Sequence, residues 1–95
     1  MLNSELRIAK INQVEKEFLT SFNHSQIEFK KEGNNFIVLF LGLKLGYSKL
    51  AVLENQYFHS DIEAKIRAAI RQERDFIKYE IDNNVSTRTL FVENA

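Results

Sequence analysis

A row of four basic side chains is the feature of the sequence best patterned for binding. Its members are Arg67, Arg71, Arg74 and Lys78. On a helix, the spacing i, i+4, i+7 and i+11 places all four within an arc of about 60°. Like charges at i, i+4 destabilise a helix by roughly 0.2–0.5 kcal/mol, so this clustering is unfavourable unless an anionic partner offsets it. The row therefore predicts a binding face for nucleic-acid phosphates or for an acidic protein surface.

The same basic residues also fit a plain solvated helix face. Three of them have an acidic residue four positions away, in the pairs Glu63–Arg67, Arg71–Asp75 and Lys78–Asp82. Pairs of this kind form ordinary surface salt bridges, which contribute little to stability. The sequence leaves both interpretations open.

Carboxylates occupy positions where apolar residues are expected. Glu15 and Glu73 each project near the centre of the apolar arc of a predicted helix, and Glu80 lies close to Glu73 in the helical pattern. If both arcs face one core, the two acids could meet and raise one pKa, as in an acid–base pair. Alternatively, Glu73 and Glu80 lie beyond the sheet, in water or at a subunit contact. No glycine-rich loop, nucleophile elbow or metal-ligand spacing supports catalysis by these acids.

Several kinds of site are excluded by the residues that the sequence lacks. It contains no cysteine and two histidines, His24 and His59, which excludes a disulfide scaffold, a thiolate zinc site and an all-histidine metal cage. His59-Ser60-Asp61 contains the letters of a hydrolase triad, but triad members must meet in space and Ser60 is expected to cap a helix. We therefore expect no catalytic, metal or cofactor-binding residue, no cofactor and no enzymatic activity.

The length and composition fit one small domain. The chain has 95 residues, of which 32 are Leu, Ile, Val or Phe, and 13 basic residues balance 13 acidic ones. This neutrality excludes a basic nucleic-acid arm as the whole explanation of function. The longest apolar run, Phe36–Leu41, is far shorter than the roughly 20 residues of a membrane helix, and residues 1–5 do not resemble a signal peptide. A soluble, cytoplasmic protein with no membrane association is expected.

The first half of the chain predicts one helix and a sheet. A helix over residues 4–22, capped by Asn3 or Ser4, places six apolar side chains on one arc: Ile8, Ile11, Val14, Phe18, Leu19 and Phe22. Residues 27–30 alternate as a half-buried strand, and 33–35 form a turn. Residues 36–41 form a central strand buried on both faces. Residues 42–46 form a hairpin loop or a bulged edge, and a third strand covers 47–54.

The second half predicts a long helix and a short strand. Ser60 and Glu63 form a capping box, from which a helix runs to about Asp82. Residues 87–92 are predicted to form a short strand. The stretch that contains them, residues 84–95, is either an edge strand or a loose tail. The order is α-β-β-β-α-β. It predicts an α+β meander, with a three- to four-stranded antiparallel sheet and two helices packed on it.

The long helix is expected to overhang the sheet. About 22 residues span about 33 Å as a helix, whereas an eight-residue strand reaches at most about 27 Å. The overhanging end carries Phe76, Ile77 and Ile81, which need cover. Either residues 90–92 fold back on them or a second copy covers them. We predict the second copy, in a homodimer, because an apolar patch rimmed by both charge signs suits a two-fold contact.

The element order is similar to that of the double-stranded-RNA-binding domain. Glu63-Ala64-Lys65 followed by Ala68-Ala69 also resembles part of that family's second helix. That family places paired lysines at the start of this helix, whereas this helix begins Ser60-Asp61-Ile62-Glu63. An acidic first turn suits the helix dipole but repels RNA. The chain is therefore not assigned to that family.

Two functions follow as hypotheses. The first is a non-catalytic protein-interaction module, such as a small regulator or inhibitor of a larger partner. A phage or mobile-element origin fits the size and composition of the chain, by association with proteins of this kind. The second is nucleic-acid binding through the basic row. The aromatic residues Tyr47, Tyr57, Phe58 and Tyr79 are interpreted as core or rim side chains, although an exposed set would stack on single-stranded nucleic acid.

Overall fold

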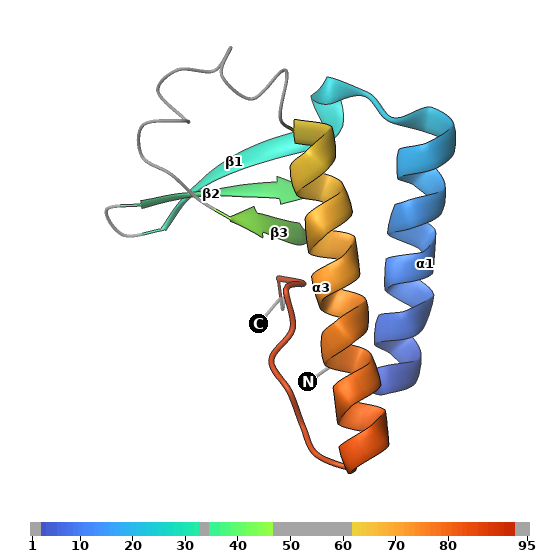
Figure 1. Cartoon of the computed structure of the whole chain (residues 1–95). Coiled ribbons are helices and arrows are strands. Elements are labelled where there is room, and N and C mark those ends of the chain that lie inside the picture. Colours follow the sequence, from blue (N-terminus) through green and yellow to red (C-terminus); the bar gives the residue numbers. More distant parts are fainter. Residues whose placement is uncertain (1–2, 33–34, 47–61, 93–95) are drawn as a thin grey trace.

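The chain has an α+β architecture, in which two antiparallel helices lie beside a three-stranded antiparallel sheet (Figure 1). The computed structural model describes residues 3–32, 35–46 and 62–92, and every structural statement below concerns these ranges. The predicted fold class is confirmed. The capping box at Ser60 and the strand predicted over 47–54 lie outside the described residues.

Helix α1 (Ser4–Ser21) begins where the sequence predicts. The Asn3 side chain caps it by accepting a 2.8 Å hydrogen bond from the Leu6 amide. Its buried residues follow the spacing i, i+4, i+7, i+11 and are Arg7, Ile11, Val14 and Phe18. Ile8 and Leu19, which were predicted to face the core, are 38% and 70% exposed. The buried arc is thus rotated toward Arg7, which leaves an apolar flank of α1 uncovered.

The sheet is a meander with β2 in its centre. Strand β1 (Ile27–Glu32) pairs with β2 (Asn35–Phe40), and β2 pairs with β3 (Leu43–Gly46). Four consecutive β2 side chains are buried, from Ile37 to Phe40, which confirms the prediction of a strand covered on both faces. A short 3₁₀ helix, η1 (His24–Gln26), joins α1 to β1.

A two-residue turn connects β2 to β3. Leu41 and Gly42 both have positive φ, at 51° and 84°. Such turns match the right-handed twist of a hairpin. The prediction of a break over 42–46, as a hairpin loop or a bulged edge, is wrong for most of this segment: the chain resumes as strand β3 at Leu43, and the register shifts between Val38 and Leu39.

Helix α3 (Ile62–Asn83) packs against both α1 and the sheet and extends past β3, as its length predicts (Figure 1). From Asn84 the chain turns back along α3, and Phe91 pairs with Leu43 in a single bridge. The backbone of Leu90 accepts from the Lys44 amide, and the Val92 amide donates to Gly42. The strand predicted over 87–92 is therefore one bridge within the described chain. The amides of Thr87 and Leu90 donate to carboxylates of α3 instead of to a ladder.

One apolar core joins these elements. The sheet contributes Val38, Phe40 and Leu43, α1 contributes Ile11, Val14 and Phe18, and α3 contributes Ile62, Ile66, Ala69, Ile70 and Ile77, with Phe91 closing it. At the end nearest β1, the rings of Phe18, Phe22 and Phe40 meet edge to face with centroids 5.4–6.1 Å apart. Edge-to-face contacts of this kind stabilise a core beyond the area that they bury.

Candidate functional site

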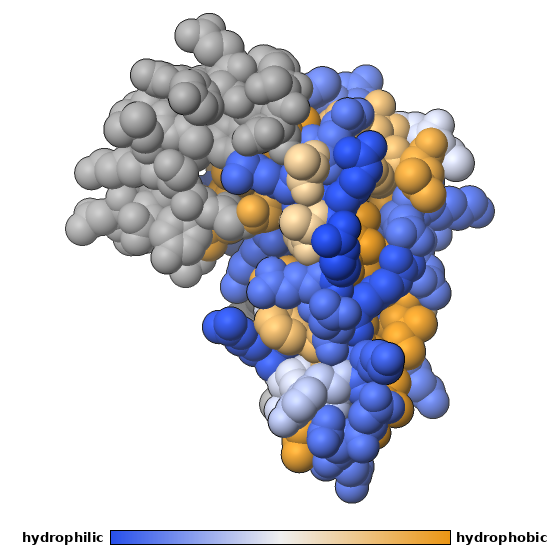
Figure 2. Space-filling view, in the orientation of Figure 1, coloured by the Kyte–Doolittle hydropathy of each residue, from blue (hydrophilic) through white to orange (hydrophobic). Residues whose placement is uncertain are grey.

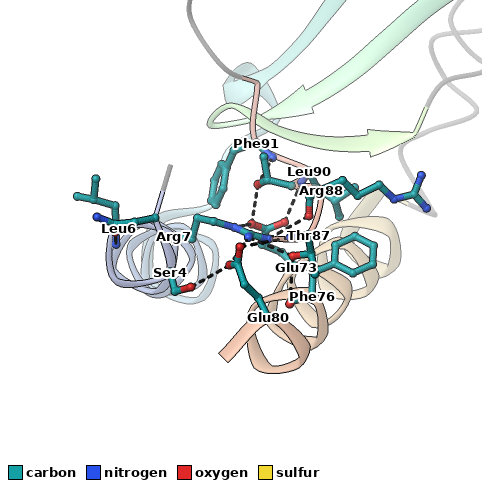
Figure 3. Close-up of polar contacts among 12 residues, drawn as sticks. Ser4, Leu6, Arg7, Glu73, Phe76, Glu80, Thr87, Arg88, Leu90 and Phe91 are labelled. Carbon is teal, nitrogen blue, oxygen red and sulfur yellow. Dashed lines mark hydrogen bonds and ion pairs between the residues drawn. The ribbon is translucent and has the colours of Figure 1, made fainter. Parts of the chain in front are cut away.

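A buried arginine links three parts of the chain. Arg7 is 1% exposed, and it projects from α1 toward α3 and the C-terminal segment (Figure 3). Its Nε donates to Glu73 Oε2 at 2.9 Å, and its Nη1 donates to Glu80 Oε2 at 2.8 Å. Its Nη1 and Nη2 also donate to the Thr87 hydroxyl and to the Arg88 carbonyl. The guanidinium thus holds both helices and the returning chain together.

Glu73 is the centre of this buried network. It is fully buried, and besides Arg7 it accepts from the Thr89 hydroxyl at 2.7 Å and from the Leu90 amide at 2.8 Å. Both carboxylate oxygens are therefore occupied. Of the alternatives left open for Glu73, the one that places it beyond the sheet, in water or at a subunit contact, is excluded, because the C-terminal segment folds over it. Glu73 also does not pair with Glu15, since each acid has a different arginine as its partner.

Glu80 closes the solvent-facing end of the network. The Ser4 hydroxyl and the Thr87 amide both donate to its carboxylate, at 2.8 and 3.3 Å. The hydrogen bond from Ser4, together with those from Thr87 and Arg7 and the charge of Arg7, lowers the pKa of Glu80. Among the described residues, no buried side-chain nitrogen or oxygen lacks a hydrogen-bond partner. The network therefore supports the fold and presents no free polar group to a ligand.

A second feature is a groove along the outer side of the two helices, here called the interhelical groove. Its lower part, beside the end of α3, is lined by Ile8, Ile11, Ile77 and Ile81. Its upper part, beside the start of α3, is lined by Phe18, Leu19 and Ile70. Figure 2 shows apolar atoms between polar ones where α1 and α3 adjoin. Ile8, Leu19 and Ile81 are 38%, 70% and 54% exposed, so the groove carries apolar surface in contact with solvent.

An ion pair crosses the interhelical groove between its two parts. Arg74 Nη1 and Nη2 donate to the two oxygens of Glu15 at 2.7 and 2.8 Å, and Nη2 also donates to Asn12. The hydrogen bonds from Arg74 lower the pKa of Glu15, and those to Glu15 raise the pKa of Arg74. More than a third of each side chain is exposed, so solvent screens this pair. Glu15, whose position on the apolar arc of α1 left its burial open, is thus partly exposed at the surface.

The predicted basic row forms one lip of the interhelical groove. Arg67 and Arg71 line its upper part, Lys78 lines its lower part, and Arg74 lines both. The Arg67 guanidinium lies over the ring of Phe18, at 5.4 Å from its centroid. Within the described chain, no ion pair forms in any of the three i, i+4 pairs that the sequence suggested, although Asp75 and Asp82 also line the groove.

The predicted contact residues Phe76, Ile77 and Ile81 do not form one patch. Ile77 is 3% exposed and belongs to the core. Phe76 lies beneath the C-terminal segment, with the Arg88 guanidinium 5.6 Å from its ring. Ile81 is on the groove side, about 140° around the helix from Phe76. Most of the cover for the end of α3 is therefore intramolecular, and Ile81 alone of the three remains on an open face.

The described residues give little support for other chemistry. They contain no group of three His, Cys, Asp or Glu side chains suited to a metal ion. The ring of His24 lies against Phe22, while His59 and three of the four aromatic candidates lie outside the described ranges. No helix in the described part of the chain combines the length and hydropathy needed to cross a membrane. Comparison with protein-family models, curated proteins and solved structures found no match for this chain.

Sequence reasoning missed Arg7 and the exposed flank of α1. The signal for Arg7 was present, because it continues the spacing of Ile11, Val14 and Phe18 by one step of four toward the N-terminus. A basic residue at the end of an apolar arc predicts a buried partner, and Glu73 was already identified on the other helix. The exposure of Ile8 and Leu19 depends on how far α1 is rotated against α3, and helical periodicity alone does not determine that rotation.

Proposed function

We propose that this chain is a non-catalytic module that binds another protein through the interhelical groove. The observation that carries the proposal is the exposure of Ile8, Leu19 and Ile81 along the two parts of the groove, which meet at Arg74 and each have an apolar floor. Exposed apolar surface of this kind, rimmed by polar side chains, marks interaction sites on proteins. More specifically, we propose that the chain is a small regulator or inhibitor of a larger partner and acts in the cytoplasm.

The charges around the groove favour a protein over a nucleic acid. Four basic residues line it, but so do the acids Glu15, Asp75 and Asp82, and the whole chain is neutral. Phosphate backbones are bound mainly through a large excess of positive charge, whereas four bases against three acids leave this groove an excess of only one. Mixed charges at the rim of an apolar floor are typical of protein interfaces. Nucleic-acid binding is therefore the alternative that the experiment must exclude.

Affinity capture from cells that encode the chain, with and without nuclease, tests this proposal. The native chain is compared with Ile8→Ser/Ile81→Ser, which makes the groove polar, and with Leu6→Ser/Tyr79→Ser, which removes exposed apolar side chains elsewhere. We expect capture of one protein to persist after nuclease treatment and with the control variant, and to be lost with the groove variant. The same protein should bind the purified chain in a calorimetric titration. The proposal would be refuted if capture of the protein required nucleic acid, or if it were unchanged with the groove variant.

A further inference from the structure

We infer that a second copy of this chain is an occupant of the interhelical groove, so that a two-fold dimer covers the site until another partner displaces it. This inference rests on the proposed function, because it names a partner and a means of regulation for the same site. The order of charges and apolar side chains along α3 and α1 supports this inference. When one copy is turned end over end, the two ends of the groove become complementary, whereas like charges meet near its middle.

The Arg74–Glu15 pair divides the groove into two parts with different chemistry. Toward the start of α3, the rim carries Arg67 and Arg71, neither of which forms an ion pair within the described chain. Toward the end of α3, the rim carries Lys78 together with Asp82. The first part therefore carries three basic and two acidic side chains, whereas the second carries two of each, and its Asp82 forms no ion pair within the described ranges.

A two-fold axis perpendicular to the helices, at the level of Arg74, superposes these opposite ends. Arg67 precedes Arg74 by seven residues, and Asp82 follows it by eight, so Arg67 of one copy reaches the level of Asp82 of the other. Near the axis, Arg74 faces Arg74 of the second copy and Arg71 reaches the level of Lys78, so like charges meet there and oppose association. The Arg67–Asp82 and Arg71–Lys78 contacts are each formed twice in a two-fold dimer.

The apolar side chains match under the same operation. Leu19 is the most exposed large apolar residue of the described chain, and it lies at the level of Arg67, next to Phe18. Ile81 follows Arg74 by seven residues, so Leu19 of one copy comes to the level of Ile81 and Ile8 of the other. The hollow there has an apolar floor of Ile11 and Ile77. Leu19 can enter this hollow as a knob between two helices.

The size of this face predicts a weak dimer. Helix α1 has 18 residues and is about 27 Å long, and two adjacent helices are about 20 Å wide. A contact of that size is at the lower end of stable interfaces, which bury about 1,200–2,000 Å² in total. Association is therefore expected in the micromolar range, where a stronger partner could displace the second copy.

Sedimentation velocity from about 1 μM to about 500 μM tests the dimer. We expect the native chain to change from monomer to dimer across this range and Leu19→Ser to weaken association about tenfold or more. Arg67→Asp and Asp82→Arg should each weaken it, and the two together should restore it, because the pair is re-formed with exchanged signs. Leu6→Ser is the matched control and should change nothing.

Two results would overturn the inference. One is a native chain that stays monomeric over the whole concentration range, and the other is a dimer whose association is unchanged by Leu19→Ser and by both charge reversals. Its failure is distinct from failure of the proposed function. A monomer that still captures a protein through the groove would refute only the dimer. A dimer that responds to these variants but retains no other protein would refute only the binding of another partner.

Discussion

Arg7 on α1 and Glu73 on α3 form a 2.9 Å ion pair in which both side chains are closed to solvent. Charged groups of this kind are expensive to bury unless hydrogen bonds satisfy them completely. Here Thr87, Thr89, Glu80 and the backbone of residues 88–90 supply the remaining partners. The pair therefore fixes the position of the C-terminal segment as well as the contact between the helices.

Removing the arginine should destabilise the fold strongly. Arg7→Met keeps much of the side-chain volume but leaves Glu73 buried without a counter-charge, and breaking such a pair typically costs about 3–5 kcal/mol. Urea denaturation followed by circular dichroism measures the loss. Adding Glu73→Leu to Arg7→Met should recover part of the stability, because the uncompensated charge is removed. An Arg7→Met variant as stable as the native chain would contradict the burial of this pair.

The Thr89 hydroxyl should contribute through its hydrogen bond to Glu73. Thr89→Val keeps the shape of the side chain but removes a donor 2.7 Å from a fully buried carboxylate, together with the acceptor of the Phe91 amide. Hydrogen bonds to charged groups contribute about 1.5–3 kcal/mol, so the free energy of unfolding should fall by about that amount. Thr20→Val is a matched control, because that hydroxyl is exposed and donates to a carbonyl within its own helix. Equal effects of the two substitutions would contradict the prediction.

Stability should fall in acid through Glu80 and Glu15. The pKa of each carboxyl is lowered from its ordinary value of 4.5, so the folded chain binds fewer protons than the unfolded chain near that pH. Their contribution is complete above about pH 4.5 and is lost as the pH falls through the lowered values. Denaturation midpoints measured from about pH 7 to about pH 2 should show this decline. Glu80→Gln should make it shallower, and an unchanged slope would argue against the bonds from Ser4 and Thr87.

A substitution in the turn between β2 and β3 should increase the stability of the fold. Leu41 has φ of 51°, a left-handed conformation that costs a residue with a branched side chain about 1–2 kcal/mol. Asn followed by Gly is the favoured sequence for such a turn, so Leu41→Asn should raise stability by about 0.5–1 kcal/mol. Thermal unfolding measures the gain. Gly42→Ala is the contrasting variant: it has room for a Cβ but should destabilise, because Gly42 also has positive φ.

The local elements of this protein were determined by the sequence itself. Residues 4–22 carry helical periodicity and a capping Asn3, and 36–41 carry an apolar run flanked by turn residues, so both elements appear where they were predicted. Propensity and periodicity act over a few residues, and one chain is enough to reveal them. Arg7 and Glu73 could also have been paired, since each is a charged residue on an apolar helical arc.

Only the tertiary structure decided which side chains those elements bury. The rotation of α1 against α3 buries Arg7 and exposes Ile8 and Leu19, and the return of the C-terminal segment covers Glu73. Within the described residues, the strand predicted over 87–92 is reduced to one bridge, because the amides of Thr87 and Leu90 donate to carboxylates of α3. The burial of Arg7 depends on contacts between residues 66 and 80 positions apart, with Glu73 and Thr87, and the return of the C-terminal segment on contacts 7 to 17 positions apart with Glu80 and Glu73. Long-range packing and hydrogen bonding, which local periodicity does not encode, therefore created the groove and the buried network.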